Sequence, residues 1–300
     1  MRYLKQALTF DAQIDLLASR GLIFADHASA VHTLARISYY RLSAYWHPFK
    51  RHDDTFEPGT YLETVVRLYE LDRHLRLQVM DSIERIEIAL RTAMTYTLCH
   101  AFGPYGHCNP ANFRANFDHK QWLAKAHIEA QQSREEFVQH FRRKYDGFPD
   151  LPLWMATETL PFGSLSRLYA GMRADEQRSI AADYCVHHDV LRSWLHALAY
   201  VRNICAHHAR LWNRELAIAP ELPRRDPRWC PPMTPTNRRV FAVLLVLRQM
   251  MAHHRGGGHW QRRVSALIET ADLGTASRVA MGLPEGWVEH PLWNRQSAET

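Results

Sequence analysis

Apolar residues recur every three or four positions along most of this chain, which is the spacing of α-helices with one buried face. The longest such stretch runs from Tyr61 to Ala101, and a straight helix of that length would measure about 60 Å. No internal repeat and no series of alternating, strand-like segments accompanies this pattern. We therefore expect an all-α fold.

Shorter helices are expected on either side of this stretch, separated by turns rich in Gly and Pro. The expected ranges are 11–20, 26–45, 110–145, 151–164, 164–172, 175–184, 190–219, 238–254, 260–272 and 276–281. Residues 283–300 have the composition of a surface tail. The chain divides into an N-terminal helical segment (1–60), a helical core (61–215) and a C-terminal helical extension (216–300), which we expect to pack as one compact unit.

Composition adds limited information about partners. The 300 residues are 46% hydrophobic and include nine Trp, which is enough for a substantial core. The formal net charge of +6 is a modest excess, compatible with an RNA partner, and the 19 His make this charge rise below neutral pH.

The cysteine pattern and the hydropathy bear on the compartment. The five Cys form no C-x-x-C pair, which favours reduced thiols over a disulfide framework. No stretch approaches the ~20 apolar residues of a membrane span, and the N-terminus lacks the apolar core of a signal peptide. We expect a cytoplasmic protein without a membrane partner.

The segment from Tyr200 to Arg214 holds the most suggestive chemistry. Arg202, Asn203 and His207 fall close together, and no Gly or Pro interrupts residues 190–219, which predicts one long helix through the segment. On an ideal helix Asn203 and His207 are about 40° apart, whereas Arg202 and His207 diverge by about 140°. Because Arg has a long side chain, the three groups are able to converge beside one edge of the helix.

These three groups suit cleavage of RNA without a metal. An imidazole that titrates near neutral pH is able to take a proton from the attacking 2′-hydroxyl or to give one to the leaving 5′-oxygen. A guanidinium stabilises the extra negative charge of the transition state, and an amide positions the phosphate or the imidazole. Spacing alone favours the ordinary alternative, in which Arg202 and His207 only cap or solvate a helix.

Two further regions offer contacts to RNA. Tyr40 and Arg41 lie in an aromatic-rich run, although most of its rings are expected to pack the hairpin onto the body of the protein. Arg142, Arg143 and Lys144 form a basic run that would contact phosphates or, equally well, neutralise the dipole of their own helix. Arg210, just after the motif, is a further candidate for RNA binding.

A metal site is not evident. His doublets occur at 187–188, 207–208 and 253–254, but the chain has neither H-E-x-x-H nor a Cys/His zinc spacing. We therefore expect no metal and no cofactor. A metal held by several helices stays open as an alternative.

Four ordered motifs give the chain a family resemblance. They are 21–45, Leu68–Arg76, Ile83–Arg91 and Val201–Arg214, and within the last, Arg202 to His207 resembles the R-x4-6-H signature of HEPN-domain ribonucleases. This set resembles the Abi-like (AbiD/AbiF) abortive-infection proteins of bacteria over residues 5–215. It is also similar to the HEPN domains of RNA-guided type VI CRISPR effectors.

The resemblance implies a helical HEPN-type bundle and a toxin-like endoribonuclease in defence against phage. It makes Arg202, Asn203 and His207 catalytic and His208 a flanking residue, and it implies a homodimer with two facing motifs and an RNA or protein inhibitor.

The resemblance also places the segment 83–91 against the motif helix. Glu84 or Glu87 would then orient His207 or pair with Arg202, whereas the spacing of Glu87 and Arg91 predicts an ordinary ion pair between those two. The alternatives to a metal-independent endoribonuclease are a non-catalytic RNA-binding module and a metal-dependent hydrolase that uses the His-rich helices.

Overall fold

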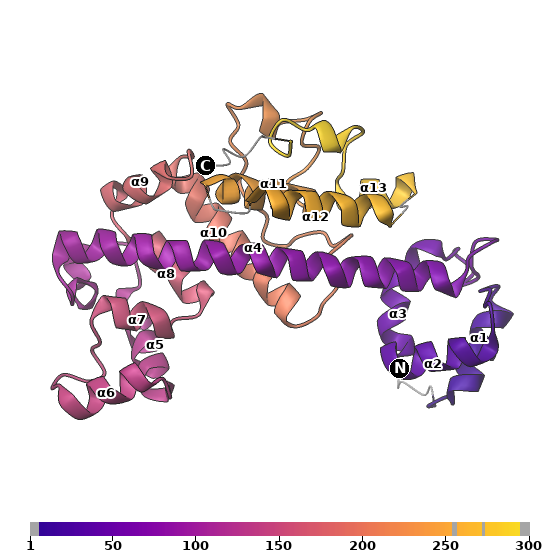
Figure 1. The fold of residues 1–300 in the computed structure, drawn as a ribbon, viewed down its shortest axis with the longest axis horizontal. Coiled ribbons are helices and arrows are strands. Elements are labelled where there is room, and N and C mark those ends of the chain that lie inside the picture. Colours follow the sequence, from indigo (N-terminus) through magenta and orange to yellow (C-terminus); the bar gives the residue numbers. More distant parts are fainter. Residues whose placement is uncertain (1–5, 254–256, 272–273, 295–300) are drawn as a thin grey trace. The chain divides into compact units, whose positions relative to one another are not determined.

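A computed structural model describes residues 6–253, 257–271 and 274–294 (Figure 1). These residues form α-helices α1–α13 joined by loops and short 3-10 turns. Within the described ranges, β-pairing amounts to three isolated bridges. The all-α prediction is confirmed.

The described residues fall into two compact units. The first holds the described parts of 1–75 and 266–272, and the second holds those of 76–265 and 273–300. Helix α4 (Leu62–Phe102) begins in the first unit and continues into the second, and it matches the predicted long helix within one residue at each end.

In the first unit the chain forms α1 (Phe10–Ser19), α2 (His27–Ile37), α3 (Tyr39–Trp46) and the start of α4. The prediction of one helix over 26–45 is wrong, because Ser38 adopts φ 69° and its side chain accepts the N–H of Arg41 to start α3. Tyr45 is buried and donates its hydroxyl proton to Asp72 Oδ2 at 2.7 Å, so this part of the aromatic run packs as expected.

In the described part of the chain, α4 is followed by nine further helices. They are α5 (His119–Gln132), α6 (Glu136–Lys144), α7 (Leu153–Thr159), α8 (Phe162–Gly171), α9 (Ala174–Ala182), α10 (His188–Ala206), α11 (Val240–Met250), α12 (Gly257–Thr270) and α13 (Thr275–Met281). These helices belong to the second unit, except that α12 continues into the first unit from residue 266. The region 110–145, predicted as one helix, contains α5 and α6 instead. Asp118 caps α5 through the N–H of Gln121, and Ser133 then leaves the helical conformation with ψ 133°.

Helix α11 lies at the centre of the second unit's core, because each of its residues from Val240 to Met250 is buried. A helix that is apolar on all sides has to be covered on all sides. Its polar members are held from other segments: Arg248 Nε donates to the Trp293 carbonyl at 3.3 Å, and the Gln249 amide donates to the Tyr184 carbonyl at 3.1 Å.

The C-terminal segment covers part of this core, so the prediction of a surface tail over 283–300 is wrong for its described residues. Leu283, Trp287, Leu292 and Trp293 are buried. Trp293 donates its indole N–H to Ser265 Oγ at 2.9 Å. Because Pro and Gly interrupt this segment, its buried residues show no helical spacing, and the sequence pattern therefore does not predict their burial. Residues 295–300 lie outside the described part, as do His254 and Asp272 of the predicted elements.

Within the second unit, the C-terminal extension also packs on α4. Trp260 on α12 donates its indole N–H to the Gln78 carbonyl at 2.7 Å, and Arg263 pairs with Asp81 at 2.8 Å. The extension therefore helps to hold the part of α4 that lies in this unit.

Replacement of Trp293 tests the role of this segment. Because the Trp293 side chain is fully buried, Trp293→Ala is expected to lower the free energy of unfolding by about 3–5 kcal/mol, measured by denaturant titration followed by far-UV circular dichroism. Trp154→Ala is the matched control, since Trp154 is 51% exposed. Equal stability of the two variants would contradict the assignment of Trp293 to the core.

Candidate active site

The Arg202–His207 motif lies at the C-terminal end of α10, which packs against α8 and α9. One face of α10 is buried from Leu191 to Cys205, as its apolar spacing predicts. Trp194 on this face is fully buried and donates its indole N–H to the Glu221 carbonyl at 2.7 Å. The motif therefore sits on a firmly held helix.

Helix α10 ends at Ala206, so the prediction of a helix to Ala219 is wrong. His207 is the C-cap, and His208 takes the left-handed conformation with φ 55°. The N–H groups of His208 and Ala209 donate to the carbonyls of Cys205 and Ile204, both at 3.0 Å, which is the Schellman arrangement.

The burial of two bulky side chains explains this turn. Leu211 and Trp212 follow it and are 0% and 1% exposed. A left-handed conformation costs a non-Gly residue about 1–2 kcal/mol, and burying either side chain stabilises the fold by a similar amount or more. No Gly marks the turn, so the sequence conceals it.

The side chains of Arg202, Asn203 and His207 are available for binding. Arg202 is half-buried, and Asn203 and His207 are exposed. Within the part of the chain that the structure describes, these side chains make no hydrogen bond or ion pair. His207 still donates its backbone N–H to the Asn203 carbonyl at 3.0 Å, so the two residues stay one helical turn apart.

The two further candidates next to the motif have structural roles. His208 is exposed and supplies the left-handed residue that reverses the chain. Arg210 is half-buried, and its carbonyl accepts a hydrogen bond from Arg214 Nε at 2.8 Å. Both residues shape the loop that follows His207.

On α4, Glu87 pairs with Arg91, as the four-residue spacing predicts. Arg91 also donates to the carbonyls of Thr157 and Leu160, the latter at 2.9 Å, so it ties the end of α7 to α4. Glu84 is exposed and, in the described part of the chain, makes no hydrogen bond or ion pair. The contact of Glu84 or Glu87 with Arg202 or His207 that the family resemblance implies is not seen among the described residues.

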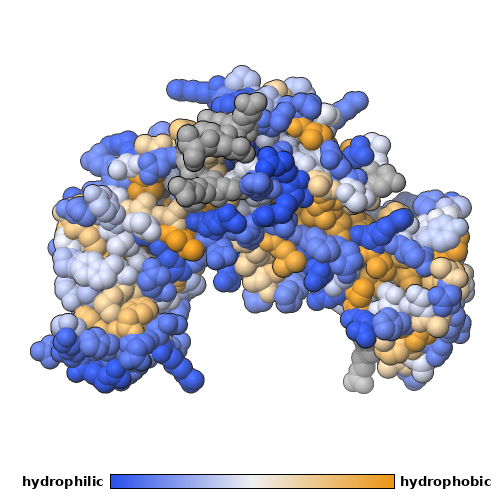
Figure 2. Space-filling view, viewed as in Figure 1, coloured by the Kyte–Doolittle hydropathy of each residue, from blue (hydrophilic) through white to orange (hydrophobic). Residues whose placement is uncertain are grey.

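The predicted RNA-contacting residues are accessible. In the first unit, Tyr40 is 87% exposed on α3, and Arg41 is exposed beside it. In the second unit, Arg142, Arg143 and Lys144 are exposed in the last turn of α6. Helix α6 is drawn at the lower left of Figure 1, where the surface in Figure 2 is largely hydrophilic.

The basic run on α6 already has local partners. Arg143 pairs with Glu136 at 3.1 Å, and Arg142 lies over the ring of Phe148 at 5.1 Å. The position of the run at the end of α6 also suits the helix dipole.

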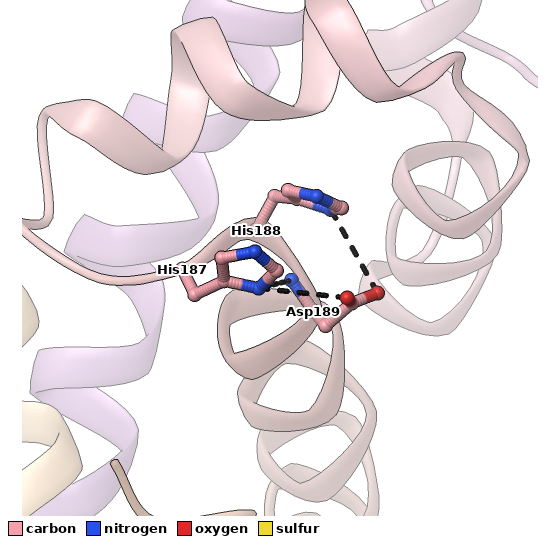
Figure 3. Close-up of side chains that lie close together, drawn as sticks. All are labelled: His187, His188 and Asp189. Carbon is pink, nitrogen blue, oxygen red and sulfur yellow. Dashed lines mark hydrogen bonds and ion pairs between the residues drawn. The ribbon is translucent and has the colours of Figure 1, made fainter. Parts of the chain in front are cut away.

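One cluster in the described residues has the composition of a metal site. His187, His188 and Asp189 at the start of α10 offer one ligand atom each, all within 4.8 Å of one another (Figure 3). Burial lowers the pKa of His188, which favours the neutral imidazole that metals bind. Two contacts oppose a cation: the guanidinium of Arg192 lies 3.0 Å from the Asp189 carboxylate, and His187 Nδ1 accepts the N–H of Asp189 at 3.3 Å.

This cluster is remote from the motif. His188 and His207 are 19 positions apart on one helix, so about 28 Å separates them along the axis. A metal bound at His188 would not reach His207.

A pocket of about 610 Å³ between α8 and α10 was missed by the sequence reasoning. Asn203 lines it, together with Arg192, His196 and Tyr200 from the same face of α10 and Arg167 from α8. The spacing of the α10 residues, at positions 192, 196, 200 and 203, is a signal that the sequence does contain. Nothing in the sequence placed Arg167 beside them.

None of the described helices combines the length and the apolar composition needed to cross a bilayer. No curated protein and no solved structure matches the chain. The family model of the Abi-like proteins matches residues 32–213, which is more than half of the chain and includes α10 with its motif. The chain therefore belongs to the Abi-like protein family.

Proposed function

We propose that this protein is a metal-independent endoribonuclease toxin of bacterial defence against phage, in which Arg202, Asn203 and His207 cleave single-stranded RNA. Membership of the Abi-like family supports a role in abortive infection. The enzymatic part rests on one observation: these three polar side chains have no hydrogen-bond or ion-pair partner among the described residues, at the end of a helix whose opposite face is buried. Polar side chains that served only to stabilise α10 would form hydrogen bonds or ion pairs with the protein.

The reaction is a transesterification within the RNA. The 2′-oxygen attacks the adjacent phosphorus and loses its proton, while the bond from phosphorus to the 5′-oxygen breaks and that oxygen gains a proton. The products are a 2′,3′-cyclic phosphate and a 5′-hydroxyl. His207 takes up or delivers one of the protons, the Arg202 guanidinium binds the non-bridging oxygens of the transition state, and Asn203 positions the phosphate.

One motif supplies one imidazole, whereas the reaction requires two proton transfers. A two-fold homodimer with both motifs at a single cleft would supply the second His207. The exposure of Asn203 and His207 on each chain is compatible with this arrangement. A toxic ribonuclease also requires control, and we propose that an RNA or protein inhibitor covers the motif.

Removal of the proposed catalytic groups is expected to abolish cleavage. His207→Ala should lower the cleavage rate of a labelled single-stranded RNA by about 10²–10⁴-fold, and Arg202→Ala by about 10²–10³-fold. Arg202→Lys should recover part of the rate, because Lys keeps the charge but loses the bidentate fork. The measurement is gel analysis of the products of the purified protein, with the 2′,3′-cyclic phosphate ends identified by mass spectrometry.

His259→Ala is the matched control, since His259 is exposed on α12 and lies outside the motif. It should cleave at the wild-type rate. RNA that binds the wild-type protein and the His207→Ala variant equally but is cut by neither would favour the non-catalytic RNA-binding module.

The cluster of His187, His188 and Asp189 allows the alternative of a metal-dependent hydrolase to be tested directly. Because His188 lies about 28 Å from His207 along the helix, cleavage should persist in excess EDTA, and His188→Ala should keep at least half of the wild-type rate. Loss of activity both in EDTA and in His188→Ala, with recovery after addition of Zn²⁺ to the wild-type protein, would instead identify a metal-dependent hydrolase.

A further inference from the structure

Two adjoining pockets lie along the face of α10 that leads to Asn203. The pocket between α8 and α10, here called the α8–α10 pocket, measures about 610 Å³ and ends at Asn203. A second pocket of about 380 Å³, here called the arginine pocket, is lined by Arg114, Arg167 and Arg192 together with Asn116 and Gln121. Arg167 and Arg192 line both pockets, so the two adjoin one another.

The arginine pocket carries excess positive charge. Its carboxylate, that of Asp118, accepts the N–H of Gln121 and caps α5. Arg192 pairs with Asp189, whereas Arg114 and Arg167 form no ion pair with any residue that the structure describes. Arg167 donates instead to the neutral Gln121 side chain at 3.3 Å. Guanidinium groups without a carboxylate partner at one small pocket favour an anion with several oxygens, and phosphate is such an anion.

The α8–α10 pocket has a different character. Its two Arg are balanced by the carboxylates of Asp189 and Glu221. The rest of its lining includes the hydroxyl groups of Ser166 and Ser193, the imidazole of His196 and the phenol ring of Tyr200. A pocket without net charge that offers hydrogen-bonding groups and an aromatic ring suits a base and its ribose better than a phosphate.

The order of these groups along α10 defines a path to the motif. Arg192 precedes Asn203 by 11 positions, or about 16 Å along the axis, and His207 follows one turn later, after about 6 Å. We propose that the arginine pocket binds a backbone phosphate of the RNA strand and that the α8–α10 pocket holds the nucleotides between this phosphate and the one cleaved at His207. This inference rests on the proposed function, because it takes single-stranded RNA as the ligand of the motif.

Binding measured in a His207→Ala background tests the arginine pocket independently of cleavage. Arg114→Ala and Arg167→Ala should each weaken the binding of a fluorescent ten-nucleotide single-stranded RNA by about tenfold. Each should also reduce the slope of log affinity against log salt by about one, since each removes a phosphate contact. Lys125→Ala is the matched control, because Lys125 is an exposed cation on α5 that lines neither pocket and makes no ion pair in the described part of the chain. It should bind with unchanged affinity and slope.

Gly163 allows the α8–α10 pocket to be filled without a change of charge. It lines this pocket, and a Cβ placed on it would meet no atom within 4 Å. Gly163→Trp in the same background should weaken RNA binding by about tenfold or more and keep the thermal stability of Gly163→Ala, which should bind as the parent does.

The outcomes separate this inference from the proposed function. If the wild-type protein does not cleave RNA, the proposed ribonuclease function is wrong. Weaker RNA binding by these variants would nevertheless still support RNA binding along the two pockets. Arg114→Ala and Arg167→Ala that bind RNA as Lys125→Ala does, or a Gly163→Trp that binds as Gly163→Ala does, would overturn the path. If these variants lose only the binding of uridine 5′-monophosphate and keep that of RNA, the arginine pocket serves a free nucleotide, and the path is likewise overturned.

Discussion

The second unit is built on the need to cover α11 on every side. A helix whose 11 residues are all buried has no face left for water, so segments from elsewhere in the chain have to pack on it. Trp293 does so near the end of the described chain, and Arg248 accompanies it by donating to its carbonyl. The carbonyl of Tyr184, just before α10, accepts a hydrogen bond from Gln249 and so joins the start of the motif helix to the same core.

This packing explains how a polar motif is displayed on a rigid support. α10 buries one face from Leu191 to Cys205, and the Schellman turn at His208 then sends the chain away so that Leu211 and Trp212 are buried. The turn ends the helix directly after the motif. As a result, the side chains of Asn203 and His207 are exposed at the end of the helix, whereas the backbone beneath them is fixed by its own hydrogen bonds.

The sequence predicts those features that depend on local spacing. Helix α4 follows from its uninterrupted apolar period, and the Glu87–Arg91 pair follows from its four-residue separation. The end of α10 does not follow from local spacing, because the residue in the left-handed conformation is His208 and not a Gly. The turn is stabilised instead by the burial of Trp212, four residues further along the chain. The arginine pocket is likewise not predictable from local spacing. It brings together Arg114 from the loop before α5, Arg167 from α8 and Arg192 from α10, and no regular spacing along the chain relates these residues.

The segment that covers α11 is synthesised after the motif it helps to support. Residues 202–207 leave the ribosome well before Trp287 and Trp293, which close over the ring of Phe241. Until those indoles have emerged, the core of the second unit lacks part of its lining, and apolar surface around Phe241 is not yet covered. The scaffold beneath the motif is therefore complete only after Trp293 has been synthesised, 86 residues after His207.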